Sequence, residues 1–286
     1  MLKVIIAGYD RMLAALIKGV LDTGHEIKGV MRIDRVKYDN FALFLKDIFA
    51  PSRDYSYIKS RNLKEIKANS VNSKKFRDFA LKSGADVILV GSWGEKFSIE
   101  TVELLKYGVI NCHPSLLPNH RGANPYFWQI YSGDSRAGVT FHFMDEKYDS
   151  GEILMQGAFD ITPDMTGGAL RTKTAETTEV MVGQLLKDLE NNLIIPVKQD
   201  ETKAVYDRWE EDLRFIDFNV ESPLNIHNKI RGLRPFCYPV VRFKDKVYKI
   251  EHSVLIEEKN KGFEMAKDGR LLIVRYDSCT LKLTLI

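Results

Sequence analysis

Apolar positions in the first third of the chain form short runs separated by a stretch with helical spacing. Residues 2–7 are apolar apart from Lys3 and lead to Gly8, a helical spacing of apolar residues follows, and a second strand is predicted near 27–31. A strand, a helix and a further strand in this order are typical of a parallel, right-handed α/β unit. A helix predicted at 73–83 and a strand predicted at 85–90 continue the order. The pattern therefore predicts an α/β domain built on a mostly parallel sheet.

The apolar pattern changes after a long helical stretch at 169–190, which we expect to close the first domain. A second helix is predicted at 222–231, with Ser222 as its N-cap and Pro223 at its first position. Short predicted strands follow at 240–243, 247–251, 254–257, 271–276 and 281–286. Strands of this length and spacing are typical of a small barrel. The predicted first domain, linker and second domain are 1–195, 196–209 and 210–286.

Composition places the chain among ordinary globular proteins. Hydrophobic residues make up 44% and charged residues 28% of the 286 positions, as in globular domains generally. No apolar run approaches the roughly 18 residues that span a bilayer, and the amino terminus lacks a signal-peptide pattern, so we expect a cytoplasmic protein without membrane contact. The net charge of +3 is mild, so any nucleic-acid contact has to come from local patches.

Two further patterns argue against particular kinds of site. The turn at residues 8–11 lacks the second and third glycines of the dinucleotide fingerprint, so NAD is not expected. The cysteines are widely separated, odd in number and in no Cys-x-x-Cys pair: Cys112, Cys237 and Cys279. We therefore expect neither a disulfide framework nor a metal site.

Candidate chemistry lies where a short apolar strand, 107–111, ends at Asn111. Prolines just beyond it prevent a regular helix, and ligands collect at the carboxyl ends of strands in an open α/β sheet. Side chains two residues apart on an extended segment point the same way, so the Asn111 amide and the His113 imidazole face one region. Cys112 lies between them and points away, which argues against a thiol nucleophile.

Asp149 follows the next apolar run, 137–144, in a turn-prone Tyr-Asp-Ser-Gly stretch. If the two strands are neighbours, as sequential strands often are, its carboxylate reaches His113. An amide donor, an imidazole and a carboxylate suffice for attack on a carbonyl carbon, because the amide stabilises charge on oxygen and the imidazole carries protons near neutrality. The alternative is that Asn111 and Asp149 make turn hydrogen bonds while His113 caps a strand end.

The run Asn111-Cys112-His113-Pro114-Ser115-Leu116-Leu117-Pro118, followed by Arg121-Gly122 and by Asp149-Ser150-Gly151, resembles the motif of the folate-dependent formyltransferase family. This family includes methionyl-tRNA formyltransferases and related sugar N-formyltransferases. The resemblance implies a Rossmann-like catalytic domain followed by a small β-barrel domain that is OB-fold-like. It also implies that Asn111, His113 and Asp149 are the catalytic trio, and that 10-formyltetrahydrofolate donates its formyl group to a primary amine.

The resemblance further implies which residues contact the substrates. Loops at the carboxyl edge of the sheet would cradle the folate, and the residues concerned are Val90, Gly91, Trp93, Ser115, Leu116, Leu117, Pro118, Phe141, Met144 and Asp145. Flat heterocycles are usually held by backbone amides and apolar walls, although Trp93 fits a core position equally well. Arg121 and Gly122 would contact substrate, but Arg121 fits equally well as the partner of an acid. His142 alternates with Thr140 on its strand and is predicted to be a packing histidine.

Residues 32–67 interleave basic and aromatic side chains and allow two interpretations. The members are Arg32, Arg35, Lys37, Tyr38, Phe41, Phe44, Phe49, Arg53, Tyr55, Tyr57, Lys59 and Arg61. Such interleaving can hold a nucleic acid by phosphate contacts and stacking. We favour an amphipathic helix at 41–49 packed on the domain, with a solvated loop after Pro51. Methionyl-tRNA formyltransferases usually carry a basic loop here that meets tRNA, and only Asp34-Arg35 resembles it.

Several acceptors fit the expected chemistry. Methionyl-tRNA, which we favour slightly, is supported by the two-domain layout and by basic residues on or near the predicted barrel: Lys229, Arg231, Arg234 and Lys244. A nucleotide-linked amino sugar is supported by the weak basic loop and the modest net charge. Hydrolysis of 10-formyltetrahydrofolate, with water in place of the amine, would need the same trio. A non-catalytic RNA-binding scaffold is disfavoured because the trio is intact.

Overall fold

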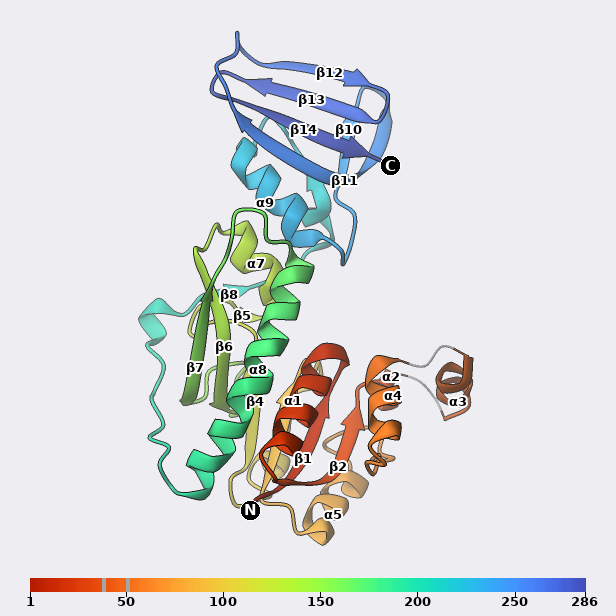
Figure 1. Ribbon diagram of the computed structural model, residues 1–286, viewed down its shortest axis with the longest axis vertical. Coiled ribbons are helices and arrows are strands. Elements are labelled where there is room, and N and C mark those ends of the chain that lie inside the picture. The colour runs from red at the N-terminus through yellow and green to blue at the C-terminus, as the bar shows by residue number, and fades with distance from the viewer. Residues whose placement is uncertain (38–39, 50–51) are drawn as a thin grey trace. The chain divides into compact units, whose positions relative to one another are not determined.

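The computed structural model of the protein describes residues 1–37, 40–49 and 52–286 (Figure 1). These residues cluster into two compact units. The first consists of Met1–Arg121, Gly138–Ala158 and Thr172–Val205, and the second of Gly122–Ala137, Phe159–Arg171 and Tyr206–Ile286. Two segments from the middle of the chain thus cluster with the carboxyl-terminal residues. Within the described ranges, no helix is long and apolar enough to cross a membrane.

Helices and strands alternate through the first unit, and strands dominate the end of the second. The helices are α1 (Asp10–Asp22), α2 (Asp34–Lys37), α3 (Asn40–Phe49), α4 (Arg53–Ser60), α5 (Lys74–Ser83), α6 (Ile99–Val102), α7 (Pro125–Tyr131), α8 (Gly167–Glu190) and α9 (Pro223–Leu233), with 3-10 turns η1 (Glu201–Lys203) and η2 (Glu211–Arg214). The strands are β1 (Lys3–Gly8), β2 (Glu26–Arg32), β3 (Val87–Gly91), β4 (Val109–His113), β5 (Arg121–Gly122), β6 (Arg136–Phe143), β7 (Ile153–Asp160), β8 (Tyr206–Asp207), β9 (Phe215–Ile216), β10 (Val240–Phe243), β11 (Lys246–Glu257), β12 (Glu264–Asp268), β13 (Leu271–Tyr276) and β14 (Cys279–Leu285).

The first unit is built on a six-stranded sheet with the order β2-β1-β3-β4-β6-β7. β1 is parallel to β2 and β3, β3 is parallel to β4, and β6 runs antiparallel to β4. Strands covered on both faces need apolar residues at successive positions, and every residue of β3 is buried. The prediction of a mostly parallel sheet is therefore confirmed.

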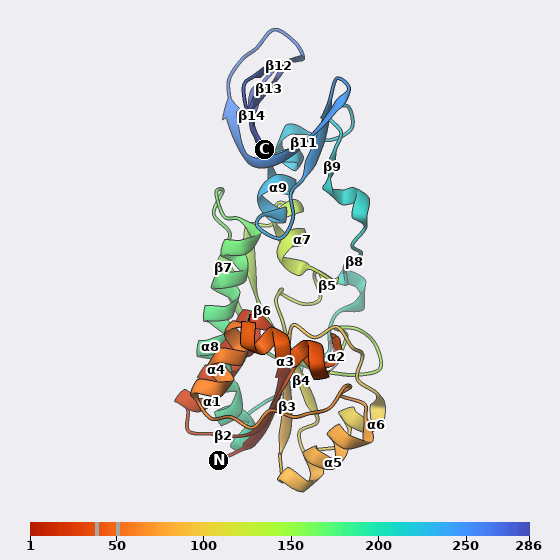
Figure 2. The ribbon, with the colours of Figure 1, turned by 90° about the vertical axis from the view of Figure 1, so that its right-hand side faces the viewer.

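Helices cover both faces of this sheet (Figure 2). Successive side chains of a strand point to opposite faces, so Val4 and Ile6 pack in one core with residues of α1 and α8. Ile5 and Ala7 pack in the other core with Phe76 of α5. The apolar residues of β1 thus contribute to two hydrophobic cores, because β1 is an interior strand of a sheet that is covered on both faces.

The second unit contains a separate six-stranded sheet with the order β12-β13-β14-β11-β10-β9, and this sheet is curled (Figure 1). All its paired strands are antiparallel except β9 and β10. Ile226 and Ile230 of α9 pack in the core that this sheet forms. The predicted cap is confirmed, because Ser222 accepts a hydrogen bond from the Asn225 backbone at 3.2 Å. β12 and β9 lie at the two ends of the strand order, so the barrel stays a prediction.

Two expectations about elements were wrong, and one strand was missed. We expected a solvated loop after Pro51, which itself lies outside the described ranges, but helix α4 begins at Arg53. Its Ile58 is 3% exposed and packs with α1. The two strands predicted at 247–251 and 254–257 are one strand, β11, with a register irregularity between Ile250 and His252. The edge strand β12 was not predicted, because its polar sequence carries no apolar signal.

Arg32 does not lie on a surface that a nucleic acid can reach. Its side chain is 0% exposed. Its two terminal nitrogens donate to both carboxylate oxygens of Asp47 at 3.0 and 2.7 Å, and Nε donates to Glu65 at 2.8 Å. The guanidinium also lies 4.6 Å from the centre of the Tyr55 ring. For Arg32, the nucleic-acid interpretation of the basic-aromatic segment is therefore wrong, because these internal partners, together with Asp34 at 3.3 Å, already surround the cation.

We expect Arg32→Leu to lower the free energy of unfolding by about 3–5 kcal/mol, because it leaves buried carboxylates without their cation. Lys28→Leu is the control, since Lys28 pairs with Glu26 at the surface and should cost at most about 1 kcal/mol. Urea unfolding followed by circular dichroism measures both. Equal losses in the two variants would contradict a structural role for the buried ion network.

Candidate active site

Strands β4 and β6 bring the predicted catalytic trio together. Their register places Asn111 opposite His142 and His113 opposite Thr140. Asp149 lies in the loop that connects β6 to β7. Its Oδ1 accepts a hydrogen bond from Asn111 Nδ2 at 3.2 Å and lies 3.4 Å from His113 Nδ1. The expected approach of carboxylate to imidazole is present in the fold.

His113 is held at both ring nitrogens. Nδ1 faces Asp149, and Nε2 lies 2.8 Å from the backbone oxygen of His120. Both neighbours are acceptors, so the imidazolium, which donates from both nitrogens, satisfies both contacts. Burial by itself lowers the pKa of His113, but the charge and hydrogen bond of Asp149, together with the His120 carbonyl, raise it above its ordinary value overall.

Asp149 is the other half of this ion pair. Burial by itself raises the pKa of the Asp149 carboxyl, yet the charge of His113 and the hydrogen bond to it hold that pKa well below its usual range. A carboxylate that is mostly out of water needs such partners to stay ionised. At neutral pH the site therefore holds a carboxylate that stabilises positive charge on the neighbouring imidazole.

His142 has a packing position, as predicted, but it also contacts the trio. Its side chain is 1% exposed, and Nδ1 lies 2.8 Å from the Phe143 carbonyl oxygen, so Nδ1 carries the hydrogen. Nε2 is then the acceptor for Asn111 Nδ2 at 3.1 Å, and it also lies 3.6 Å from Asp149 Oδ1. His142 thus orients the Asn111 amide. Residue alternation along one strand could not reveal this contact, which follows from the pairing of two strands.

Cys112 lies between Asn111 and His113 in sequence but on the other face of the strand. Its Sγ is 3.4 Å from Thr178 Oγ1, and the residue is buried. Burial raises the pKa of the thiol to about 12. The predicted orientation is confirmed, and a thiolate is not populated near neutrality.

Thr140 fixes the loop that follows β4. Its hydroxyl donates to the Ser115 carbonyl at 2.7 Å and accepts from the Leu117 backbone at 3.1 Å and from Gln156 at 2.9 Å. This loop leads to His120, whose carbonyl faces the imidazole described above. The position of the imidazole therefore depends on a side chain of the neighbouring strand.

The residues predicted to contact folate lie along β3, β4 and β6 or in the loops after them, and they divide by exposure. Buried members are Val90, Gly91, Ser115, Leu117 and Phe141, and partly exposed members are Trp93, Leu116, Pro118, Met144 and Asp145. At the buried positions only the backbone is left to meet a ligand. A Cβ on Gly91 would lie 2.9 Å from Leu16 Cδ1, so that glycine is needed for packing against α1.

Trp93 is the member of this group with an unfulfilled polar atom. Its Nε1 is buried and has no hydrogen-bond partner among the residues that the structure describes, while its ring packs on a hydrophobic core of the first unit. A buried donor without an acceptor costs about 1–3 kcal/mol. An acceptor atom of a ligand at this position would remove that cost, which fits the predicted folate contact.

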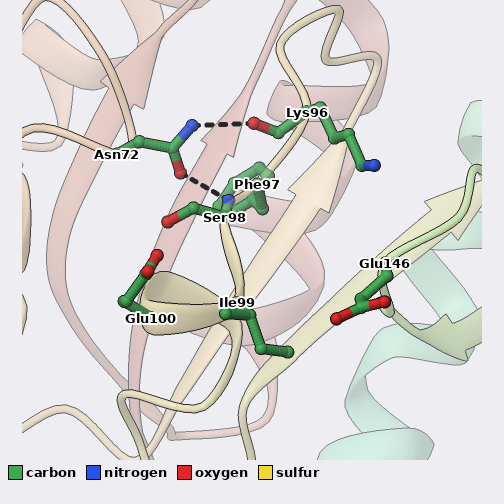
Figure 3. Close-up of a pocket in the computed structure, with 7 residues that line it drawn as sticks. All are labelled: Asn72, Lys96, Phe97, Ser98, Ile99, Glu100 and Glu146. Carbon is green, nitrogen blue, oxygen red and sulfur yellow. Dashed lines mark hydrogen bonds between the residues drawn. The ribbon is translucent and has the colours of Figure 1, made fainter.

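A pocket of about 480 Å³ lies beside these loops (Figure 3). Asn72, the segment from Lys96 to Glu100, and Glu146 line it. The Asn72 side chain bridges the Lys96 carbonyl and the Ser98 backbone N–H at 2.7 Å each and so shapes its wall. None of the trio lines this pocket. One of its lining residues, Glu146, follows the predicted folate contact Asp145 in sequence.

Arg121 is fully buried and paired inside the first unit. It forms a two-pronged ion pair with Glu201, with nitrogen–oxygen distances of 3.0 and 2.7 Å. Its Nε and Nη2 also donate to Gln199 Oε1 at 3.1 and 2.7 Å. Of the two roles considered for Arg121, the structure favours pairing with an acid. Gly122 has a φ of 97°, in the left-handed region that favours glycine.

Two basic residues expected to support tRNA binding have partners inside the second unit. Lys229 is 4% exposed, pairs with Glu221 and donates to the Phe215 carbonyl at 3.0 Å. Arg231 donates to the Met165 carbonyl at 2.8 Å. These contacts stabilise the unit and do not depend on a nucleic acid. Within the described part of the chain, no group of three or more His, Cys, Asp or Glu is arranged to hold a metal ion.

The sequence matches the family described as formyl transferase over residues 3–185. A methionyl-tRNA formyltransferase of Clostridium novyi is 37% identical over 206 residues, which are 66% of this chain and 65% of that protein. A methionyl-tRNA formyltransferase of Lachnospira eligens is 26% identical over 283 residues, which are 98% of this chain and 88% of that protein. The match to the Clostridium novyi protein thus covers just under two thirds of its length.

Solved structures share the fold over the whole chain. An N-formyltransferase from Helicobacter canadensis, in complex with folinic acid and dTDP-3-aminofucose, superposes with a TM-score of 0.75. The superposition covers 100% of both chains at 19% sequence identity. A sugar 3N-formyl transferase crystallised with dTDP and 5-N-formyl-THF superposes with a TM-score of 0.76, 19% identity and 100% and 98% coverage.

We expect His113 to titrate above its ordinary value and Asp149→Asn to lower its pKa, because the variant removes the negative charge beside Nδ1. Histidine ring resonances in ¹⁵N NMR, followed against pH, measure both values. His25, whose pKa burial lowers, is the control in the same spectra and should titrate alike in both proteins. An unchanged His113 midpoint in the variant would contradict the ion pair.

Proposed function

We propose that this chain, which belongs to the formyl transferase family, transfers a formyl group from 10-formyltetrahydrofolate to a primary amine. The observation that carries the proposal is the convergence of Asn111 and His113 on Asp149 Oδ1, at 3.2 and 3.4 Å. An amide donor, an imidazole and an ionised carboxylate within one hydrogen-bonded group are the parts that acyl transfer to an amine requires.

The proposed reaction is an addition followed by an elimination. The amine nitrogen forms a bond to the formyl carbon, and negative charge builds on the formyl oxygen. The carbon–nitrogen bond to tetrahydrofolate then breaks, and the proton lost by the amine passes to the departing nitrogen. Each step exposes a charge that the trio is suited to stabilise, and one preorganised donor is typically worth about 3 kcal/mol to such a transition state.

We assign the oxyanion to the Asn111 amide, with the positive charge of the neighbouring imidazolium beside it. Both amide hydrogens of Asn111 are directed at acceptors, Asp149 Oδ1 and His142 Nε2. The role therefore requires that one of these hydrogens turn to the formyl oxygen when the donor binds. His113, whose pKa is raised, supplies positive charge beside the reacting carbon, and Asp149 keeps that charge stable.

The folate is proposed to bind at the edge formed by the ends of β3 and β4 and the loop after β6. Two observations support this placement. Trp93 Nε1 is buried without a partner among the described residues, and the partly exposed Met144 and Asp145 lie in the loop that leads to Asp149. A ring held here by backbone groups would bring its formyl substituent towards the trio.

We take methionyl-tRNA as the first acceptor to test, because methionyl-tRNA formyltransferases are among the relatives found, one of them 37% identical. This acceptor would place the protein in translation initiation. The curled sheet of the second unit supports an OB-fold-like assignment for that unit, which is part of the same proposal. Its exposed surface, rather than Lys229 or Arg231, would then have to contact the tRNA.

A nucleotide-linked amino sugar is the second candidate, and a separate observation favours it. The full length of the chain superposes on a sugar 3N-formyl transferase and on an N-formyltransferase in complex with dTDP-3-aminofucose. Two of the basic residues that the sequence suggested as tRNA contacts, Lys229 and Arg231, instead bind groups inside the second unit. Both observations fit an acceptor that is small and carries few phosphates.

The purified protein is supplied with 10-formyltetrahydrofolate and offered methionyl initiator tRNA in one reaction and a panel of nucleotide-linked amino sugars in another. We expect formyl transfer in one of the two reactions. His113→Ala should lower kcat by about 10²–10⁴-fold. His252→Ala, which changes an exposed histidine, is the matched control and should leave kcat unchanged. Release of formate without transfer to any amine would make the protein a hydrolase, and loss of activity in neither variant would refute the assignment of the trio.

A further inference from the structure

Residues Val197–Val205, here called the strap, return along the first unit after α8. Val197 and Ile153 exchange backbone hydrogen bonds of 2.8 and 2.9 Å. At the other end, the Val205 backbone accepts from Arg121 at 2.8 Å and donates to the Pro118 carbonyl at 3.1 Å. The whole segment lies within the predicted linker, and it clusters with the first unit. One end contacts the start of β7, which follows the Asp149 loop, and the other contacts Pro118 and Arg121, which follow β4.

Gln199 lies in the middle of the strap and bonds to the loop that carries Asp149. Its Nε2 donates to the Asp149 carbonyl at 2.9 Å and to the Gly151 carbonyl at 2.8 Å. Its Oε1 accepts two hydrogen bonds from Arg121, at 2.7 and 3.1 Å. All four hydrogen-bonding sites of the amide are therefore used, and their geometry fixes which end is nitrogen.

Arg121 anchors this amide. Its side chain is 0% exposed, whereas its partner Glu201 is 63% exposed. The hydrogen bond to Arg121 lowers the pKa of the Glu201 carboxyl, so the pair stays charged. A continuous chain of contacts thus runs from Glu201 through Arg121 and Gln199 to the backbone of Asp149.

The Asp149 loop needs such support because its backbone is under steric constraint. Asp149 has a φ of 53°, in the left-handed region that non-glycine residues adopt at a cost of about 1–2 kcal/mol. At Gly151 a Cβ would lie 1.8 Å from the Phe143 carbonyl oxygen, so the loop passes against β6 with no room for a side chain. Two hydrogen bonds from one rigid amide hold the carbonyls on either side of Ser150 in this shape.

We propose that Gln199 is a positioning residue, which holds the Asp149 loop so that the carboxylate stays within reach of His113 and Asn111. Its consequence for catalysis rests on the proposed formyl transfer. Gln199 touches neither the imidazole nor the Asn111 amide in its recorded contacts, and it acts through the Asp149 backbone. Arg121 acts one step further away, by fixing the amide of Gln199.

Two substitutions separate positioning from simple stabilisation. Gln199→Leu removes every contact of the amide at similar volume. Gln199→Glu keeps an oxygen for Arg121 and adds charge to that pair, but it turns an oxygen, instead of an NH₂ group, towards the two carbonyls of the loop. Gln184→Leu is the matched control, because Gln184 is exposed on α8 and bonds only to Asp188 in its recorded contacts.

We expect both Gln199 variants to lower kcat by about 10–100-fold, because a displacement of about 1 Å in a catalytic group has this scale of effect. The KM values for donor and acceptor should change much less, since the proposal gives Gln199 no role in substrate binding and all four of its hydrogen-bonding sites are used within the protein. The control variant should match the wild type. Thermal unfolding should show that Gln199→Glu remains folded, which keeps the test valid if Gln199→Leu does not fold.

A second readout does not depend on activity. In Gln199→Leu, the pKa of His113 in ¹⁵N NMR should fall towards its ordinary value as the carboxylate moves away. A wild-type kcat in Gln199→Glu, or an unshifted His113 pKa in a folded Gln199→Leu, would overturn the proposal. If the wild-type protein transfers no formyl group to any acceptor, the proposed function fails, and the His113 titration still decides the role of Gln199.

Discussion

The antiparallel register between β4 and β6 is the constraint on which the site depends. It places Asn111 opposite His142 and His113 opposite Thr140, so one pair of strands supplies two of the proposed catalytic groups and the side chains that orient them. A slip of β4 by one residue would exchange its two faces, and Cys112, which is almost fully buried, would then replace Asn111 and His113 on the face of the site. The hydrophobic core therefore enforces the alignment that the chemistry needs.

Asp149 joins this strand pair to the rest of the unit. Its carboxylate accepts from Asn111 and pairs with His113, and an ionised group so far from water is tolerated only because these partners surround it. The loop that carries it is not regular structure, so its shape has to come from outside contacts. The strap supplies them, and the geometry of the site consequently depends on a segment fifty residues further along the chain.

Much of the fold and the heart of the site could be predicted from sequence because the relevant signals are local. Apolar runs predict buried strands, Ser73 caps α5 by accepting from the Phe76 backbone at 3.2 Å, and the Asn-x-His spacing places two side chains on one face. Contacts that depend on pairing between distant segments left no such signal. His142 was taken for a packing residue because its strand partner was unknown, and Gln199 lies in a polar stretch without periodicity. The helix α4 forms because its apolar residues pack on α1, a tertiary effect that outweighs its polar sequence.

The net charge of the chain does not indicate where its basic side chains lie. Arg32, Arg121 and Lys229 are all buried, and each lies beside at least one carboxylate, so each cation offsets an acid within the fold. Such pairs leave the sum of +3 unchanged while removing basic side chains from the surface that a polyanion would meet. Residues chosen as tRNA contacts because they are basic are therefore no guide to the acceptor, since a buried cation paired with an acid attracts no phosphate. The distinction between a tRNA and a nucleotide-linked sugar rests instead on which exposed cations remain, and on whether they form a continuous track or a single phosphate-sized site.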